Sequence, residues 1–260
     1  DITDFFNGDS EMLFFTKRAK TEFKLGGIQK ETSYLSTVRT YPINTEIKSV
    51  KTYQKASGGD NATFEINNSF VLLPKVPMVA RYADNRVGYF TENYTDFDKN
   101  PQGVEKVSLI TRFRLEPKPE DLEKYKRGEL VEPAKPIIYY IDPATPKEWV
   151  PYLIQGVNDW QEAFEKAGFK NAIMGKVAPT KEQDSTWSLE DARYCAIVYK
   201  ASATPNASGP HVSDPRSGEI IESHVNWYHN VMSLVRNWYM LQCGPVDPSA
   251  RKMEFDTELM

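Results

Sequence analysis

The spacing of apolar and polar residues divides the chain into two regions. Over the first 115 residues the period is mostly two, which is typical of strands with one buried face. The clearest run is 106–115, which alternates apolar residues with polar and basic ones. After a glycine-rich turn, apolar runs at 62–66 and 70–73 are separated by the polar residues 67–69. We therefore predict a β-rich domain at 1–115, built as a meander of hairpins.

The composition changes between residues 116 and 136. Four prolines surround the charged stretch 120–127 in this segment. Proline lacks a backbone donor and restricts the residue before it, so regular structure is disfavoured around each one. We predict a linker at 116–136 that contains one short helix.

After residue 136 a buried strand at 136–141 is followed by a helical pattern. Apolar residues recur at three- and four-residue steps from Trp149 to Phe164, and Gly168 suits the end of a helix. The sequence Thr-Pro-Lys-Glu at 145–148 has the composition of a capping box. Pro151 would remove a hydrogen bond inside a helix, so we expect the regular part to begin near Trp149.

Further strands and a second helix follow along the chain. Period-two segments at 172–177, 192–200 and 219–228 predict strands, and 229–243 predicts a helix that ends at Gly244. Together these elements indicate an α+β fold with a mixed sheet and a backing helix. Residues 249–260 have the spacing of a helix that no stop signal closes, so we expect the fold to be incomplete at the C-terminus.

Composition narrows the choice of partners. The net charge is -4 with 26% charged residues, so there is no basic surface of the kind that binds nucleic acid. The longest apolar runs are far shorter than the roughly 20 residues of a membrane-spanning helix. We therefore expect no nucleic acid and no membrane span. The two cysteines, Cys195 and Cys243, leave one disulfide or two thiols as alternatives.

Candidate catalytic and metal-binding residues are few. The histidines His211, His224 and His229 lie within 19 positions, but none has the i, i+4 spacing of His-Glu-x-x-His. Cys195 lies in the middle of a predicted strand, where a small core residue is the more common role. The chain contains no Gly-x-Ser-x-Gly motif and no phosphate-binding glycine loop. We predict no metal ligands and no catalytic residues within these 260 positions.

In three segments the residues themselves, and not only their periodicity, resemble those of a known family. Residues 136–169 resemble the first strand and backing helix of a metzincin-type zinc peptidase, and 213–221 resemble the turn and strand before its active-site helix. Residues 83–91 are similar to a segment of the β-rich domain that precedes the catalytic domain in large exported bacterial zinc-dependent metallopeptidases. The resemblance implies a β-rich domain of unknown role at 1–115 and the upper part of a metzincin-like catalytic domain at 137–260.

The chain departs from that family in one respect. The zinc motif His-Glu-x-x-His-x-x-Gly-x-x-His, which supplies three ligands and the general base for a metal-activated water, does not occur in the sequence. By resemblance it is expected beyond Met260. The resemblance therefore implies zinc in the full-length parent protein and none in this fragment, which is expected to be inactive alone. It also implies a protein or peptide substrate and a secreted, periplasmic or cell-envelope-associated location.

The resemblance assigns one candidate binding segment. In metzincins an edge strand on the rim of the cleft pairs with extended substrate through main-chain hydrogen bonds. Gly209 and Pro210 suit an edge because proline cannot donate to a central ladder. The positional match comprises Asn206, Ala207, Ser208, Gly209, Pro210, His211, Val212 and Ser213.

Two other hypotheses of function remain open from the sequence. The chain is either a non-catalytic binding module for protein or glycan, or a pseudoenzyme or inhibitory domain. One short motif bears on inhibition: Phe-Asn-Gly-Asp at 6–9 matches the pattern by which astacin-like pro-segments place an aspartate on zinc. The alternative is a loop turn before a strand at 12–15, and we favour that interpretation.

Overall fold

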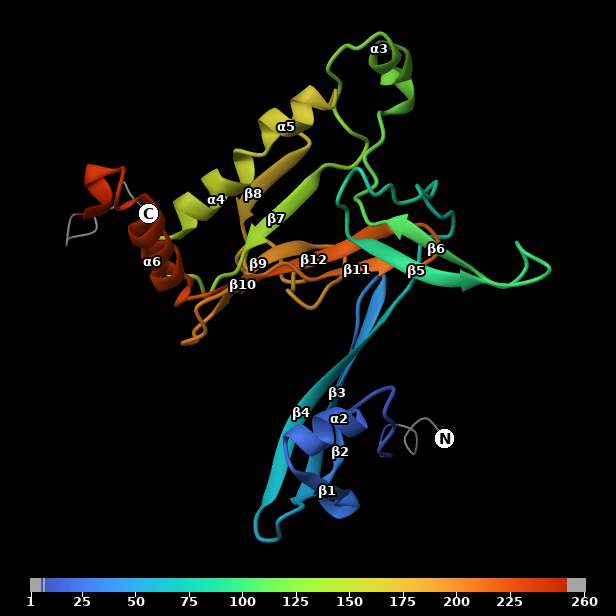
Figure 1. Cartoon of the computed structure of the whole chain (residues 1–260), viewed down its shortest axis with the longest axis vertical. Coiled ribbons are helices and arrows are strands. Elements are labelled where there is room, and N and C mark those ends of the chain that lie inside the picture. The colour runs from blue at the N-terminus through green and yellow to red at the C-terminus, as the bar shows by residue number, and fades with distance from the viewer. Residues whose placement is uncertain (1–5, 7, 252–260) are drawn as a thin grey trace. The chain divides into compact units, whose positions relative to one another are not determined.

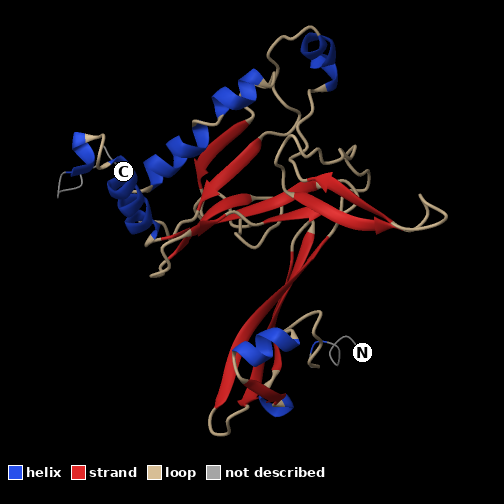
Figure 2. Cartoon of the chain, viewed as in Figure 1, coloured by secondary structure: helices blue, strands red, loops and turns tan. Residues whose placement is uncertain are grey.

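The computed structural model describes residue 6 and residues 8–251, and these have mixed α+β structure. The chain divides into two compact units (Figures 1 and 2). The first contains Asp1–Leu73 with Glu190–Ala192, and the second contains Pro74–Leu189 with Arg193–Met260. This division differs in position from the domain boundary predicted at residue 115.

Residues 74–115 belong to the second unit because their backbone is bonded into it. The Arg112 N–H donates to the Gly218 carbonyl, and the Arg112 carbonyl accepts from the Ile220 N–H, both at 2.9 Å. Just before Arg112, strands β5 (Thr91–Asp96) and β6 (Glu105–Ile110) form an antiparallel pair. Strand β6 is shorter than the predicted run 106–115.

The first unit is a twisted antiparallel sheet. Strand β3 (Asn44–Lys55) pairs with β1 (Leu25–Ile28), β2 (Tyr34–Thr40) and β4 (Asn61–Val71). The turn between β3 and β4 contains two glycines with positive φ, as its composition predicts. The break predicted at 67–69 is wrong, because β4 runs through it. The side chains of Asn67 and Ser69 donate to the carboxylate of Glu46 on β3, which satisfies them within the sheet.

Aromatic side chains cover one face of this sheet. The ring of Phe15 contacts those of Phe23, Tyr53 and Phe64, with centroids 4.8 to 5.8 Å apart. The segment 12–15 is a turn rather than the predicted strand, because the Phe14 N–H donates to the Ser10 carbonyl. Helix α2 (Lys17–Glu22) and the 3₁₀ turn η1 (Lys30–Thr32) complete the described part of the unit.

The second unit contains a six-stranded mixed sheet. The order is β8 (Ile173–Val177), β7 (Ile137–Ile141), β9 (Cys195–Lys200) and β12 (Glu219–Tyr228), and these four strands are parallel. Strands β10 (Ala207–Ser208) and β11 (His211–Asp214) both pair antiparallel with β12. The strands predicted at 136–141, 172–177 and 219–228 are confirmed, whereas β9 begins later than predicted.

The predicted backing helix forms as two shorter helices, α4 (Val150–Asn158) and α5 (Gln161–Lys166) (Figure 2). The capping box is wrong: α4 begins after Trp149, Pro151 lies in its first turn, and the buried Thr145 hydroxyl has no hydrogen-bond partner among the described residues. Helix α5 ends before Gly168, which has φ +94°.

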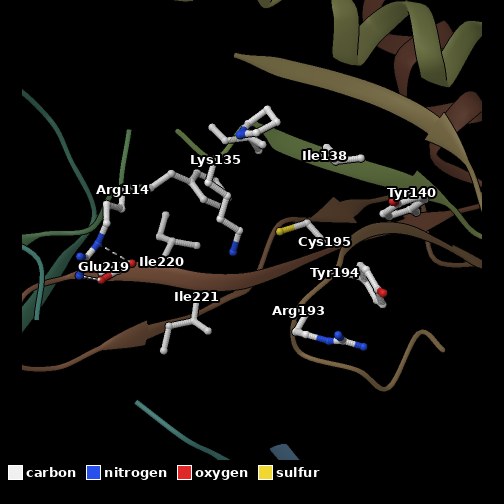
Figure 3. A pocket seen from close by; sticks show the side chains of 13 residues that line it. Arg114, Lys135, Ile138, Tyr140, Arg193, Tyr194, Cys195, Glu219, Ile220 and Ile221 are labelled. Carbon is white, nitrogen blue, oxygen red and sulfur yellow. Dashed lines mark hydrogen bonds and ion pairs between the residues drawn. The ribbon is translucent and has the colours of Figure 1, made fainter. Parts of the chain in front are cut away.

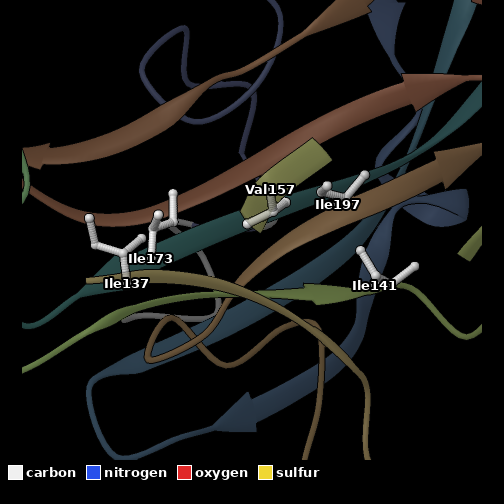
Figure 4. Packing of buried hydrophobic residues seen from close by; sticks show 5 residues of the cluster. All are labelled: Ile137, Ile141, Val157, Ile173 and Ile197. Carbon is white, nitrogen blue, oxygen red and sulfur yellow. The ribbon is translucent and has the colours of Figure 1, made fainter. Parts of the chain in front are cut away.

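The main core of the second unit lies between the helices and the parallel strands (Figure 4). It consists of five buried aliphatic residues, of which Ile141 is the most enclosed at 1% exposure. Gly175 on β8 fixes how closely α4 approaches, because a Cβ there would lie 2.9 Å from the Cα of Ile154. The cluster comprises Ile137, Ile141, Val157, Ile173 and Ile197.

The remaining elements flank this core. The linker holds η2 (Pro119–Asp121) and α3 (Leu122–Lys126), as predicted, and helix α6 (Val231–Cys243) ends at Gly244. No residue of α6 is buried, and its Val235 and Trp238 are exposed. Of the predicted C-terminal helix only residues 249–251 are described, and they belong to the 3₁₀ turn η3 (Pro248–Arg251). None of the described helices is both long and apolar enough to cross a membrane.

A candidate substrate-binding edge

The predicted binding segment forms one edge of the six-stranded sheet. Ala207 lies opposite Trp227, and Val212 lies opposite Glu222, so one register spans both β10 and β11. Gly209 and Pro210 interrupt the ladder without shifting it. Among the described strands, β12 is the only partner of β10 and of β11. The predicted edge position is therefore confirmed, and substrate binding there stays a prediction.

Side chains of the edge alternate between the two faces of the sheet. Residues directly opposite each other share a face, so His211 lies beside Ser223 and Ser208 beside Asn226. The Asn226 amide donates to the Ser208 hydroxyl at 3.2 Å, and the Ser223 hydroxyl donates to the Pro210 carbonyl at 3.2 Å. Residues 206–210 are all exposed. The edge is thus attached to β12 while its outer side faces solvent.

The turn between β11 and β12 holds the edge in place. The carboxylate of the buried Asp214 accepts hydrogen bonds from the Arg216 N–H at 2.9 Å and from its guanidinium at 2.7 Å. These hydrogen bonds lower the pKa of Asp214 against the opposing effect of burial. The Arg216 guanidinium also donates to the Pro74 carbonyl. Asp214 therefore fixes the turn that sets the register of the edge strand.

Gly218 completes this turn, and a residue with a side chain does not fit at its position. Its φ is +72°, and a Cβ at this position would lie 2.2 Å from the Ile110 carbonyl oxygen. The close approach allows the Gly218 carbonyl to accept from Arg112. By contrast, a Cβ on Gly209 would meet nothing within 4 Å.

Two contacts at the edge involve side chains from the β5–β6 region of the same unit. The Ser213 hydroxyl donates to the carboxylate of Glu92 on β5. The ring of Phe90 lies 6.4 Å from that of His211. Both partners precede the edge by more than 100 positions, so no local motif could have identified them. They show that the β5–β6 region borders the β11 part of the edge.

The histidines and cysteines are separated into different environments. The Nε2 atom of His224 lies 3.0 Å from a Glu222 carboxylate oxygen, and His229 Nδ1 lies 3.0 Å from the Tyr199 hydroxyl. Both cysteines are free, and burial raises the pKa of Cys195 to about 11. Across residue 6 and residues 8–251, no three His, Cys, Asp or Glu side chains are grouped so that they could hold a metal ion.

The segment that matches the inhibitory pattern is bound within the first unit. Its aspartate, Asp9, accepts hydrogen bonds from Lys20 at 2.7 Å and from the Tyr53 hydroxyl at 2.8 Å. The fully buried Lys51 donates to the carbonyls of Phe6 and Gly8. Asn7 lies outside the described residues. These contacts give Asp9 a structural role in the first unit, which favours the alternative of a loop turn.

Comparison with known proteins gives one match. Residues 1–118 are similar to a family described as a domain of unknown function, DUF5117. No curated protein and no solved structure matches the chain. The match ends close to the domain boundary predicted at 115 and includes the whole β5–β6 pair. It attaches no activity to the residues of the candidate edge.

Proposed function

We propose that the second unit supplies the substrate-binding sheet of a secreted or cell-envelope zinc metalloendopeptidase of metzincin type. In this proposal the edge formed by residues 206–213 pairs with an extended protein or peptide substrate. The observation that carries it is the position of β10 and β11 at the end of a sheet whose other strands are parallel. An antiparallel edge with a solvent-facing side offers main-chain groups to a bound strand.

Other features of the edge support pairing with a peptide of varied sequence. Main-chain hydrogen bonds make little demand on the side chains of the ligand. The exposed side chains of the edge are small, as at Ala207, Ser208 and Gly209, so they leave room for a neighbouring strand. The bulge between Val212 and Ser213 ends the regular ladder at the turn. Together these features define a short pairing surface rather than a pocket.

The described residues do not fit a zinc ion, because no metal-binding group occurs among them. The proposed contribution of this chain is therefore substrate positioning. In the proposal, zinc and its ligands belong to a part of the full-length protein that these 260 residues do not contain.

Fluorescence anisotropy with a labelled peptide of alternating valine and threonine tests the pairing. We expect saturable binding, and we expect N-methylation of alternate peptide amides to weaken it about tenfold, because each methyl group removes a hydrogen-bond donor. Equal binding of the methylated peptide, or no binding by folded protein, would contradict the proposal.

Substitution at Gly209 provides a matched comparison. The Gly209 N–H has no hydrogen-bond partner among the described residues, so Gly209→Pro removes one available donor from the edge, whereas Gly209→Ala retains it and its Cβ would meet nothing within 4 Å. We expect the proline variant to bind the unmethylated peptide more weakly and the alanine variant to bind it as the parent does. Thermal melts of both variants separate lost binding from lost folding.

A further inference from the structure

A second site, distinct from the edge strand, lies near the amino ends of the parallel strands (Figure 3). It is a cavity of about 250 Å³, and all the residues that line it belong to the second unit. Its apolar wall includes Phe113, Ile137, Ile138 and Ile220. The volume suits a small organic molecule, and the apolar wall would cover the body of such a molecule.

Lys135 supplies the available positive charge of this cavity. Its ammonium makes no ion pair or hydrogen bond with the described residues, and Figure 3 shows it between Ile220 and Cys195. Two other charged residues of the wall, Arg114 and Glu219, neutralise each other. The Arg114 guanidinium donates to the Glu219 carboxylate at 2.6 Å and to the Val76 carbonyl at 2.8 Å. A further cation of the wall, Arg193, lies over the Tyr194 ring at 5.2 Å. Lys135 is therefore the lining cation whose charge has no partner among the described residues, and it lies beside an apolar surface.

The opposite end of the cavity is aromatic. The rings of Tyr140 and Tyr194 meet edge to face, with centroids 5.5 Å apart, and the guanidinium of Arg193 lies over the Tyr194 ring. The hydroxyls of the two tyrosines form no hydrogen bond with the described part of the chain. Cys195 remains a thiol at neutral pH because burial raises its pKa to about 11, so it contributes an apolar surface rather than a nucleophile.

We propose that this cavity binds a small organic carboxylate with an apolar body. The carboxylate pairs with Lys135, and the body lies on the isoleucine wall towards Tyr140 and Tyr194. A single flexible ammonium suits a carboxylate, whereas phosphate sites commonly present several donors or an arginine fork. The apolar wall favours an organic acid over an inorganic anion. This inference is independent of the peptide-binding proposal, since it uses none of residues 206–213.

Isothermal titration calorimetry with 4-phenylbutyrate tests the site directly. The probes for comparison are 4-phenylbutylamine, which reverses the charge, and inorganic phosphate, which lacks the apolar body. We expect saturable binding of 4-phenylbutyrate alone. Because a charge-assisted hydrogen bond is lost, Lys135→Gln should weaken this binding by about tenfold or more. Lys176→Gln, which removes an exposed lysine from β8 outside the cavity, should leave it unchanged.

Three outcomes would overturn the inference. They are the absence of saturable binding by the folded parent protein, equal affinity for the amine, and equal affinity of Lys135→Gln and the parent. Circular dichroism of each variant shows whether it is folded. The comparison of the three probes needs no variant, so the test holds even where a substitution perturbs the fold.

Discussion

At the scale of single residues, Gly209 within the candidate edge and Gly218 in the turn that follows it make different demands on the backbone. Gly218 combines a φ of +72° with a backbone oxygen 2.2 Å from the position of a Cβ. Gly209 has neither constraint. The first glycine is required by the turn, whereas the second is required by no contact that the structure shows.

We expect Gly218→Ala to destabilise the second unit by about 3 kcal/mol, because left-handed strain and a backbone clash act together. Gly209→Ala should change the free energy of unfolding by less than about 0.5 kcal/mol. Urea unfolding of the two variants measures this difference. Equal destabilisation by both would contradict the geometry of the turn.

Asp214 provides a dependence on pH. Its pKa is lowered in the folded state, chiefly by hydrogen bonds from Arg216, so the folded protein binds its proton less readily than the unfolded chain. The stabilisation is fully present above the unfolded pKa of about 3.9 and is lost as pH falls through the lower folded value.

Asp214→Asn should therefore cost most near neutral pH and progressively less in acid. Comparing urea unfolding of this variant and the parent at pH 7, 4 and 3 measures the change. A difference in unfolding free energy that is the same at all three values would show that the charge of Asp214 contributes nothing to the turn.

At the scale of elements, Gly175 and Gly156 test how α4 packs on β8. A Cβ on Gly175 would lie 2.9 Å from the Ile154 Cα, whereas a Cβ on Gly156 would meet nothing within 4 Å. Gly175→Ala should destabilise the unit by about 1–3 kcal/mol through overpacking. Gly156→Ala should stabilise it by about 0.5 kcal/mol, because alanine favours a helix interior. Thermal melts measure both changes in stability. A Gly175→Ala variant as stable as the parent would contradict the close approach of α4 to β8.

The same scale shows what the sequence could predict. Strand β12 has the predicted bounds because its alternation is long and its turn residues are clear. The helix at 149–164 has the correct spacing, but the spacing does not reveal the break between α4 and α5. The unbroken β4 could not be predicted, because Asn67 and Ser69 are satisfied only by Glu46 across the sheet. A run of polar residues predicts a loop unless the residue that pairs with them across the sheet is known.

The candidate edge was found by resemblance, and its position follows from Gly209 and Pro210. Its neighbours were not predictable, because the Ser213–Glu92 contact joins residues 121 positions apart. The same limit applies to the cavity, where Lys135 and Tyr194 come from separate segments. The fold brings these groups together, and the spacing of residues along the sequence does not predict that they become neighbours.

At the scale of the whole molecule, the compact units and the family match divide the chain at different places. The first unit ends at Leu73, whereas the match to the domain of unknown function extends to residue 118. The β5–β6 pair accounts for the difference, since it lies in the matched region and is bonded to the turn of the second unit. Residues of the matched region therefore lie beside the proposed binding edge.

Hydrogen exchange read by mass spectrometry tests the central claim, the pairing of the edge with an extended peptide, most directly. Exchange of the protein's amides is measured with an excess of the labelled valine–threonine peptide and, separately, with an excess of a proline-rich peptide of equal length. The proline-rich peptide lacks the N–H groups needed to complete a ladder. We predict slower exchange at residues 206–213 with the first peptide alone, and unchanged exchange in β8 at the other end of the sheet. Unchanged exchange at 206–213 with saturating peptide, or equal protection by the proline-rich peptide, would contradict the account.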